Sequence, residues 1–570
     1  MIRRRLATLM CFFLFLFVFL TGTVGYYQLM KGPSLAREAA AMRNQQIEIK
    51  EWNRGEIYDR NHLLLTGNVS STALYCLPRD IQVSGLKYSQ EEARMTKASE
   101  ILAGCLKDLS SDDINSALKK AKDSGQGIIR LAADLEQEEV QAVKDTGLTG
   151  VVAAPLLKRY RDDGFCAHVL GYVGKGADSS GKAGLEKMYD EVLKGSTSGQ
   201  KIVSVQDARG MTIQGLMFRI RQEQDRDQSC LVLTIDSRVQ EVVEKAMNDQ
   251  IIRGAVVVMD IKNKEVLALA SRPTFSPYTD MEQLIKNDKQ SVLINRALSR
   301  YHPGSIFKIL VAAAVLEERT VKWQDRFLCS GSYEFSEDLS ISCWKPEGHG
   351  QLTFPQAFAN SCNTAFIDIA LDLNHSRLME YVEKFHITDE SCLGYSPDQE
   401  YSYVKVEPAR AALANACLGQ QGVMLTPLQI VSLIATIADN GQWAPPSLVR
   451  YWINGEGIKT RLEPVTKQQV ISVQTAQMVQ ELMEMTVEEG TGKNATLSMV
   501  QVAGKTATSQ VGIEKDGDKE REVLNTWFAG YLPAQNPRWA MVVLVEDGTS
   551  GAADAAPVFK TIAQGILEIL

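Results

Sequence analysis

Three short polar motifs, spread over about 200 residues, most constrain what this chain can fold into. Ser305-Ile306-Phe307-Lys308 comes first, Ser361-Cys362-Asn363 follows, and Lys505-Thr506-Ala507-Thr508 comes last. A serine three positions before a lysine is a weak signal by itself. The same spacing recurs at Ser84, Ser116, Ser179, Ser198, Ser342 and Ser402. Only Ser305 follows a Pro-Gly turn and precedes an apolar run. For the three motifs to act together, the fold must bring the Ser305 motif close to the other two.

Together the motifs supply what acyl transfer through a serine ester needs. In a helix Ser305 and Lys308 share a face, so the lysine amine can approach the serine hydroxyl. A lysine acts as a base only when neutral, and both burial and a second cation, here Lys505, lower its pKa from about 10.4. Ser305 is the predicted nucleophile; the alternative is a capping serine beside a surface lysine.

The second and third motifs have structural settings of their own. Ser361 and Asn363 begin a helical stretch and can point from its first turn into a shared cleft, although a plain helix cap is the simpler explanation. Lys505 and Thr506 lie on a run, residues 500–508, that is predicted to be an edge strand with alternate side chains facing the cleft.

The N-terminus is typical of a membrane anchor. Arg3, Arg4 and Arg5 precede an apolar stretch from Leu6 to about Gly25, which is roughly the ~20 residues that span a bilayer as a helix. The positive-inside rule then predicts a single-pass protein of the cell membrane, with a cytoplasmic N-terminus and its bulk outside. A cleaved signal peptide is the alternative, but no clear small-x-small cleavage site is present.

Composition agrees with an anchored enzyme of two domains. The formal charge of -8 and the lack of a dense basic run after the first five residues give no reason to expect nucleic-acid binding. We expect an α+β chain with a cytoplasmic tip and anchor at 1–27, an α+β pedestal at 28–230 and a catalytic domain at 231–570.

The expected catalytic domain has strands from both sequence ends around a helical middle. Two β-rich pairs are predicted, one at the start and one at the end of this domain: 254–260 with 265–270, and 527–532 with 539–546. The predicted helices between and after them are 305–318, 354–373, 427–440 and 557–570.

This whole set resembles the monofunctional, class B penicillin-binding proteins. Beyond the three motifs, the resemblance rests on further sequences along the chain. They are Arg54-Gly55-Glu56-Ile57-Tyr58-Asp59-Arg60-Asn61, Gly184-Leu185-Glu186 with Tyr189 and Gly195, Asp236 with Gln240, and Gly419-Gln420 before Thr426-Pro427-Leu428-Gln429. The resemblance implies a dimerisation-type pedestal followed by a transpeptidase domain of the penicillin-binding and β-lactamase-like fold, with an antiparallel sheet and helices.

The resemblance also implies a function, for which no catalytic cofactor is needed. The expected activity is a D,D-transpeptidase that cross-links peptidoglycan stem peptides ending in D-alanyl-D-alanine, is inhibited by β-lactams, and works with a membrane glycosyltransferase. It would serve elongation, division or sporulation, which the motifs do not separate. The alternatives are a D,D-carboxypeptidase and a non-catalytic scaffold or β-lactam sensor of the same fold.

Residue roles follow from the family pattern. Ser361 relays a proton toward the leaving group and Asn363 holds the substrate backbone and the lysine. Lys505, Thr506 and Thr508 hold the terminal carboxylate of the donor. Ala507 stands where the family usually has glycine, and its methyl group is expected to affect acylation or β-lactam binding.

Ten cysteines are many for a chain outside the cytoplasm. Cys329, Cys343, His349 and Cys362 surround the second motif, and three thiolates with one imidazole make a closed tetrahedral zinc site. Some elongation-type relatives have a structural zinc in this region. A Cys329–Cys343 disulfide and free thiols are the alternatives.

Overall fold

The computed structural model describes most of the chain, in two compact units. The described residues are 2–32, 34, 44–48, 54–67, 69–87, 89–125, 127–174, 180–194, 200–205, 219–222, 229–279, 281–288, 290–389, 392–395, 402–463, 466–516 and 519–570. The first unit comprises 1–53, 69–158 and 197–226, and the second comprises 54–68, 159–196 and 227–570. The division differs from the contiguous boundary expected after residue 230, because β2 (Glu56–Tyr58) pairs in parallel with β8 (Cys230–Leu233).

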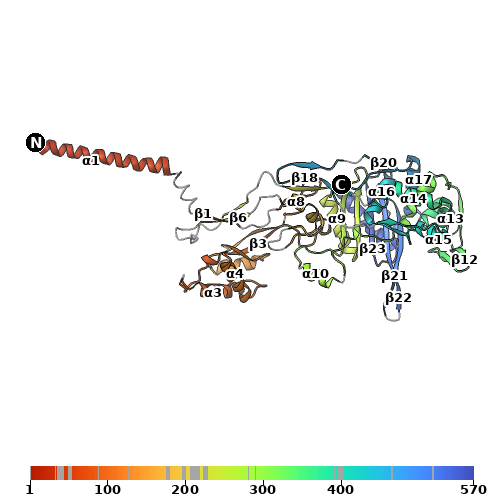
Figure 1. The fold of residues 1–570 in the computed structure, drawn as a ribbon, viewed down its shortest axis with the longest axis horizontal. Helices are drawn as coiled ribbons and strands as arrows, with labels where there is room; N and C mark the ends of the chain where they lie inside the picture. Colours follow the sequence, from red (N-terminus) through yellow and green to blue (C-terminus); the bar gives the residue numbers. More distant parts are fainter. Residues whose placement is uncertain are drawn as a thin grey trace. The chain divides into compact units, whose positions relative to one another are not determined.

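The N-terminal helix α1 (Ile2–Gly25) is drawn in red in Figure 1 and continues into a π-helical turn, Tyr26–Lys31. Residues 8–28, which extend from α1 into this turn, have a mean hydropathy of 2.2 and are long and apolar enough to cross a membrane. No other helix in the described part of the chain passes the same test.

The first unit contains two three-stranded antiparallel sheets. One has the order β4-β3-β5 and the other β1-β6-β7. Its strands are β1 (Asn44–Glu48), β3 (Val69–Cys76), β4 (Ile129–Ala132), β5 (Val151–Lys158), β6 (Gln200–Val205) and β7 (Arg219–Gln222). Helices α3 (Glu91–Ala103), α4 (Ser111–Asp123) and α5 (Gln137–Asp145) complete it. Leu74, Leu102 and Leu118 are buried in one cluster, so α3 and α4 cover a face of the sheet through β3.

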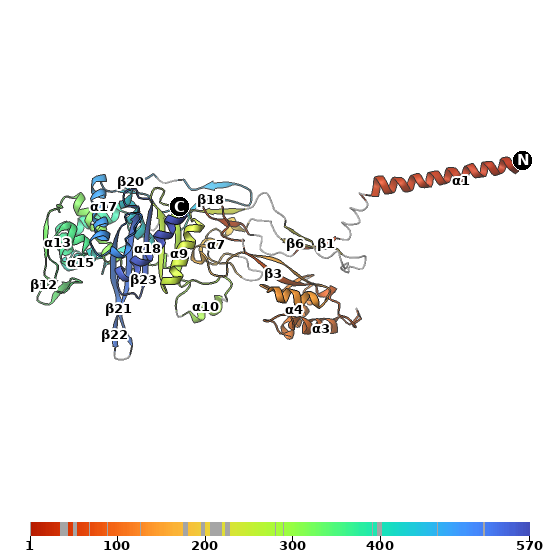
Figure 2. The same ribbon diagram turned by 180° about the vertical axis from the view of Figure 1, so that it is seen from behind.

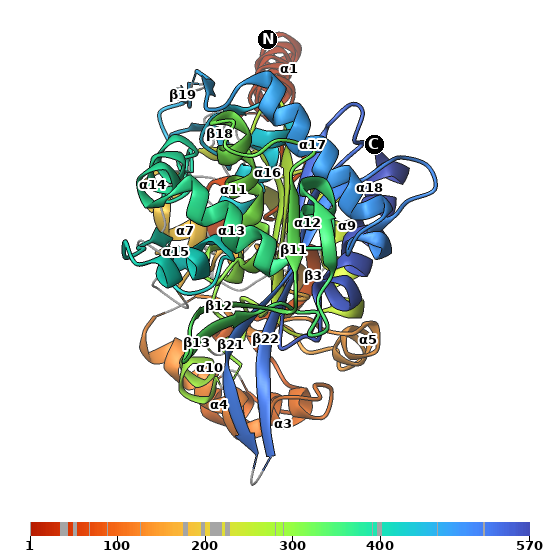
Figure 3. The same ribbon diagram turned by 90° about the vertical axis from the view of Figure 1, so that its right-hand side faces the viewer.

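A five-stranded antiparallel sheet is the centre of the second unit, with the order β10-β9-β23-β22-β21. The strands are β9 (Gly254–Asp260), β10 (Val266–Arg272), β21 (Ala503–Asp516), β22 (Lys519–Leu532) and β23 (Trp539–Glu546). Both predicted strand pairs are confirmed, and so is the edge position of the strand that contains Lys505. Figure 3 shows β21 and β22 extending together as a hairpin beyond the neighbouring strands.

Alternate residues of the central strands face two separate cores. Val257 and Met259 of β9 belong to one hydrophobic cluster, whereas Val256 and Val258 belong to another. This period of two is that of a strand buried on both faces. The first core contains α11 (Lys308–Glu317), α13 (Asn363–Leu373) and α16 (Pro427–Ala438). The second contains α9 (Ser237–Gln250) and α18 (Ala556–Ile569), which lie side by side in Figure 2.

The remaining α-helices and β-strands all lie in the second unit, and one of them, α17, contributes Val479, Leu482 and Met483 to the first core. The helices are α6 (Ala167–Leu170), α7 (Gly184–Met188), α8 (Asp190–Leu193), α10 (Met281–Asn287), α12 (Phe354–Ala359), α14 (His375–Lys384), α15 (Arg410–Cys417) and α17 (Val473–Glu488). The strands are β11 (Arg326–Cys329), β12 (Ser332–Ser336), β13 (Leu339–Ser342), β14 (Gly350–Thr353), β15 (Tyr403–Val404), β16 (Val423–Met424), β17 (Gln442–Trp443), β18 (Val449–Ile453), β19 (Lys459–Arg461) and β20 (Gln468–Gln469).

Candidate functional site

Ser305 lies in a tight turn and not in a regular α-helix. Residues Gly304–Ile306 form a 3-10 turn, and α11 begins only at Lys308, so the expected helix start at 305 is corrected to 308. Gly304 has a φ of 55°, and its N–H donates to the Gly419 carbonyl at 2.9 Å. A Cβ at Gly419 would lie 2.0 Å from the Gly304 carbonyl oxygen, so this contact requires glycine there. In a 3-10 turn residues i and i+3 are eclipsed, which keeps Ser305 and Lys308 on one side.

The second motif interrupts the helix that the sequence pattern predicted over residues 354–373. Helix α12 ends at Ala359, and α13 begins at Asn363. Between them Ser361 adopts a φ of 55°, and its N–H donates to the Phe358 carbonyl at 3.0 Å. A non-glycine residue at positive φ is strained, and such strain is often found at functional sites.

The first two motifs meet through the amine of Lys308. Its Nζ donates to the Ser361 carbonyl at 2.9 Å and to Asn363 Oδ1 at 2.8 Å, and lies 3.5 Å from Ser361 Oγ. The Asn363 side-chain amide in turn donates to the Ser342 carbonyl at 3.1 Å. Among the described residues the structure records no hydrogen bond from Lys308 to Ser305 Oγ, so that contact stays a prediction.

Burial changes the acidity of this amine. Lys308 is fully buried, and the loss of hydration lowers its pKa to about 8. The cause is desolvation, which disfavours the charged form. The hydrogen-bond acceptors recorded for the amine are neutral oxygens. With a pKa of about 8, about a tenth of the molecules carry the neutral amine at pH 7. A deprotonated amine can accept the proton of a hydroxyl nucleophile.

Lys505 is a second buried amine in the same region. Burial lowers its pKa well below the usual value, and the charge of Lys308 lowers it further. The two lysines therefore interact as expected, in that the charge of Lys308 lowers the pKa of Lys505. The Lys505 amine lies 5.7 Å from the centre of the Phe358 ring and 3.3 Å from the Thr506 carbonyl oxygen.

Ala507 faces the Ser305 turn. It is 4% exposed, and a Cβ built on Gly304 would lie 3.2 Å from the Ala507 Cβ. On its other side, Gly551 approaches so closely that a Cβ there would lie 2.5 Å from the Ala507 carbonyl oxygen. The methyl group thus lies against Gly304, and the backbone of Ala507 lies against Gly551.

Thr508, next along β21, has an exposed side chain. Its hydroxyl oxygen accepts the Gly551 N–H at 3.3 Å. A backbone N–H can only donate, so this contact leaves the Thr508 hydroxyl proton free for another acceptor.

The three predicted thiol ligands and the imidazole are clustered. One ligand atom from each of Cys329, Cys343, His349 and Cys362 lies within 4.8 Å of all the others. His349 Nδ1 is 3.4 Å from Cys329 Sγ and 3.6 Å from Cys343 Sγ. Tetrahedral zinc with Zn–S bonds of about 2.3 Å and Zn–N bonds of about 2.0 Å separates sulfur from nitrogen by about 3.5 Å. The cluster therefore fits zinc in both ligand type and spacing.

Hydrogen bonding within this cluster favours a thiolate. The Cys362 thiol donates to Cys343, which lowers the pKa of Cys343 and raises that of Cys362. His349 Nε2 is buried and has no hydrogen-bond partner among the described residues. Cys362 lies between Ser361 and Asn363, so the cluster and the second motif share one turn of chain.

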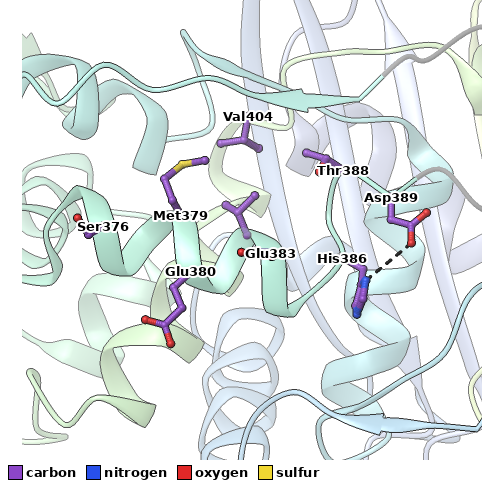
Figure 4. A pocket seen from close by; sticks show the side chains of 9 residues that line it. Ser376, Met379, Glu380, Glu383, His386, Thr388, Asp389 and Val404 are labelled. Carbon is purple, nitrogen blue, oxygen red and sulfur yellow. Dashed lines mark ion pairs between the residues drawn. The ribbon is translucent and has the colours of Figure 1, made fainter.

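A separate cavity of about 600 Å³ lies away from the motif residues. It is lined by Ser376, Met379, Glu380, Val382, Glu383, His386, Thr388, Asp389 and Val404 (Figure 4). His386 Nδ1 lies 3.7 Å from Asp389 Oδ2, and the imidazole ring stacks on Trp443. None of the three motifs contributes to the lining, so we assign this cavity no part in the chemistry.

Sequence reasoning missed one residue of the site. Thr491, in a turn after α17, places its Oγ1 2.6 Å from Thr506 Oγ1. The only signal was a threonine between two glycines, Gly490 and Gly492, after a predicted helix, which is also typical of an ordinary turn.

Comparison with known proteins identifies the family. Residues 254–564 match the model of the penicillin-binding protein transpeptidase domain, and residues 50–216 match that of the penicillin-binding protein dimerisation domain. Stage V sporulation protein D of Bacillus subtilis is 30% identical over 584 residues, spanning 98% of this chain and 85% of that protein. Peptidoglycan D,D-transpeptidase FtsI of Escherichia coli K12 is 26% identical, spanning 97% and 89%.

A solved structure agrees. The D,D-transpeptidase domain of a peptidoglycan glycosyltransferase from Eggerthella lenta matches with a TM-score of 0.58 and 25% identity, covering 73% of this chain and 93% of that one. The two domain matches, in this order along one chain with a single apolar N-terminal helix, confirm the resemblance drawn from the motifs. The chain belongs to the class B penicillin-binding proteins.

Proposed function

We propose that this protein is a serine D,D-transpeptidase that cross-links peptidoglycan stem peptides. The observation that carries the proposal is the environment of Lys308: a fully buried amine with its pKa near 8, held by Ser361 and Asn363 one turn from Ser305. A general base needs a pKa close to the working pH, and burial supplies it here. A non-catalytic scaffold has no use for a buried, uncompensated lysine.

In the acylation step Ser305 Oγ attacks the carbonyl carbon of the penultimate D-alanine of the donor. Lys308 accepts the hydroxyl proton, a C–O bond forms, and the C–N bond to the terminal D-alanine breaks. Lys308 then gives this proton to Ser361, Ser361 passes its own hydroxyl proton to the departing amine, and Asn363 holds the donor backbone. The product is an ester on Ser305 together with free D-alanine.

The third motif orients the donor. Lys505, Thr506 and Thr508 hold its terminal carboxylate, and the backbone N–H groups of Ser305 and Thr508 form the oxyanion hole. Removal of one such donor elsewhere costs about 3 kcal/mol of transition-state stabilisation. In the second step an amine of a neighbouring stem attacks the ester carbonyl carbon and the C–N bond of the cross-link forms. The C–O bond to Ser305 breaks, and the proton lost by the amine returns to Ser305 Oγ.

Covalent labelling of the full-length protein in detergent with a fluorescent penicillin tests this proposal. We expect a stable adduct on the wild type and none on Ser305→Ala. Ser402→Ala is the matched control, because Ser402 also precedes a lysine by three positions but lies outside the motifs, and it should label like the wild type. An unlabelled, folded wild type would contradict the proposal, and rapid loss of the label would indicate a hydrolase.

The anchor and the partner extend the proposal. The N-terminal helix would place residues after about 28 outside the cytoplasm, because Arg3, Arg4 and Arg5 precede it. A reporter active only outside the cytoplasm, fused after residue 570, should then be active. Cross-linking of glycan strands requires strands to be polymerised first, so a membrane glycosyltransferase is the expected partner, and it should co-purify with the full-length chain.

We also propose that Cys329, Cys343, His349 and Cys362 hold a structural zinc. Such a site has no open position for substrate, so zinc would stabilise the loop that carries Ser361 and Asn363 without acting on the donor. We expect about one zinc per purified chain by elemental analysis, and a lower melting temperature after chelation. Cys417→Ser, at a buried thiol outside the cluster, should keep the metal. A zinc-free chain with a Cys329–Cys343 disulfide in peptide mapping would contradict this assignment.

A further inference from the structure

The turn after α17 touches both the second and the third motif through one residue. Thr491 N–H donates to the Ala359 carbonyl at 3.2 Å, at the end of α12 just before Ser361. Its side chain points to the other motif, with Oγ1 2.6 Å from Thr506 Oγ1. Thr491 therefore lies between the two segments that carry the second and third motifs.

The flanking glycines hold this threonine closely against its neighbours. A Cβ at Gly490 would lie 2.2 Å from the Ala359 carbonyl oxygen, and one at Gly492 would lie 3.0 Å from the Thr486 carbonyl oxygen. The first distance is a clash that no side chain avoids without moving backbone. The glycines therefore let the turn pack directly against the end of α12, where the Thr491 N–H donates to the Ala359 carbonyl and its hydroxyl reaches Thr506.

The direction of the hydrogen bond between the two hydroxyls decides what Thr506 can do. A hydroxyl has one proton to donate and two lone pairs to accept. If Thr506 donates to Thr491, it has no proton left for a carboxylate. If Thr491 donates to Thr506, the Thr506 proton is free, and a hydroxyl that accepts one hydrogen bond becomes a better donor in the next.

The Thr508 hydroxyl also has a hydrogen-bond partner within the protein, and the direction of that hydrogen bond is fixed. The Gly551 N–H donates to its hydroxyl oxygen, and a backbone N–H cannot accept in return. The Thr508 proton is thus left for a ligand. Thr506 is 6% exposed and has a hydroxyl partner where Thr508 has an N–H.

We propose that Thr491 is a positioning residue that donates its hydroxyl proton to Thr506 and thereby directs the Thr506 proton at the carboxylate of the donor substrate. The proposal rests on the transpeptidase function proposed above, and adds a residue outside the three motifs to its specificity for anionic donors. Thr491 acts through Thr506, so loss of the Thr491 hydroxyl lowers the preference of the site for a carboxylate over a neutral group. Any effect on the chemistry at Ser305 changes the acylation rates of both kinds of ligand by the same factor and leaves their ratio unchanged.

The test compares two probes that differ only in that group. Benzylpenicillin carries the carboxylate, and its methyl ester does not. The second-order rate constant of acylation is measured for each on the full-length protein in detergent. Thr491→Val, which keeps the shape and removes the hydroxyl, should lower the ratio of acid to ester reactivity roughly 10-fold, the value expected for one hydrogen bond to a charged group. Thr491→Ser should restore the ratio.

Two controls separate positioning from packing. Thr436→Val, in the buried helix α16, removes a hydroxyl that donates to the Ser432 carbonyl and should leave the ratio unchanged. In a Thr506→Val background, Thr491→Val should have no further effect on the ratio, because the residue through which it acts is gone. Thr491→Ala serves in the same cycle if the valine variant does not fold.

The outcomes distinguish this inference from the function on which it rests. Failure of wild-type Ser305 to form any adduct overturns both. A normal wild-type adduct with an unchanged acid-to-ester ratio in Thr491→Val overturns the positioning role alone. An equal loss for acid and ester also overturns it, since that is the result of a purely structural defect.

Discussion

Two buried polar regions of the second unit provide different partners for their cationic side chains. In one, Arg54 and Arg159 both reach Glu186, at 2.5 Å and 2.6 Å, and Arg54 also pairs with Asp190 at 2.7 Å. In the other, the hydrogen bonds recorded for Lys308 and Lys505 among the described residues end on carbonyl, amide and hydroxyl oxygens.

The two regions therefore use buried cationic side chains for different purposes, one to hold the structure together and the other to transfer a proton. Arginine stays protonated in proteins, and a buried arginine therefore needs a carboxylate. Lysine can lose its proton instead, and a site with neutral acceptors makes that loss easier. The arginine region fixes segments far apart in sequence, whereas the lysine region keeps an amine ready to accept a proton.

The largest expected effect comes from removing the catalytic amine. Lys308→Met keeps an unbranched chain in an apolar site, and acylation by a penicillin should fall about 10²- to 10⁴-fold, the usual contribution of a general base. The melting temperature should change little, because no carboxylate is left unpaired. Lys264→Met is the matched control: Lys264 is also buried, but it pairs with Asp439 at 3.1 Å. Asp439 keeps Lys262 and Lys467 as partners in this variant, so we expect a modest loss of stability and an unchanged acylation rate of the folded fraction. A Lys308→Met variant that is acylated as fast as the wild type would refute the comparison.

Removing the carboxylate of the arginine region should have the reverse effect. Glu186→Gln leaves Arg159 without its charged partner and should cost about 3 kcal/mol of unfolding free energy, measured by urea titration. The folded fraction should label with penicillin at the wild-type rate. Glu100→Gln, which removes an exposed partner of Lys97, should have little effect on either quantity. Loss of labelling without loss of stability in Glu186→Gln would show that the two regions are not independent.

The pH dependence of acylation sharpens the contrast. The neutral form of Lys308 is the base, and its pKa near 8 means that most molecules are protonated below that pH. The acylation rate should therefore rise about tenfold per pH unit below 8 and level off above it. Stopped-flow labelling between pH 5.5 and 9 measures this profile. The residual rate of Lys308→Met should lack this rise, and a wild-type rate that falls with rising pH would contradict the assignment.

The smallest effect is expected at Ala507. Its methyl group is buried against the Ser305 turn, so Ala507→Gly should not open the cleft. The variant tests the expectation from sequence that the methyl group affects acylation or β-lactam binding. Acylation should change less than about threefold, and added backbone freedom should cost about 1 kcal/mol of stability, measured by urea titration. A tenfold faster acylation in Ala507→Gly would show that the methyl does reach the ligand.

Much of the second unit could be predicted from sequence because its central strands coincide with local apolar runs. The apolar runs at 254–260 and 539–546 coincide with β9 and β23. The pattern over 354–373 failed at Ser361, because apolar periodicity continues through a break that is made by one residue at positive φ. Thr491 could not be found, because its partner Thr506 lies on another element and a hydroxyl pair has no local signature.

The sequence by itself determined the three motifs, the apolar N-terminal segment, the strand pairs and the identities of the four clustered Cys and His residues. These follow from short-range chemistry and periodicity, which are written along the chain. Only the tertiary structure decided that Lys308 is held by Ser361 and Asn363, that the Ala507 methyl faces Gly304, and that Thr491 joins two motifs. Those facts depend on burial and on contacts between distant segments, because the pKa of an amine and the direction of a hydroxyl proton are set by whatever the fold packs against them.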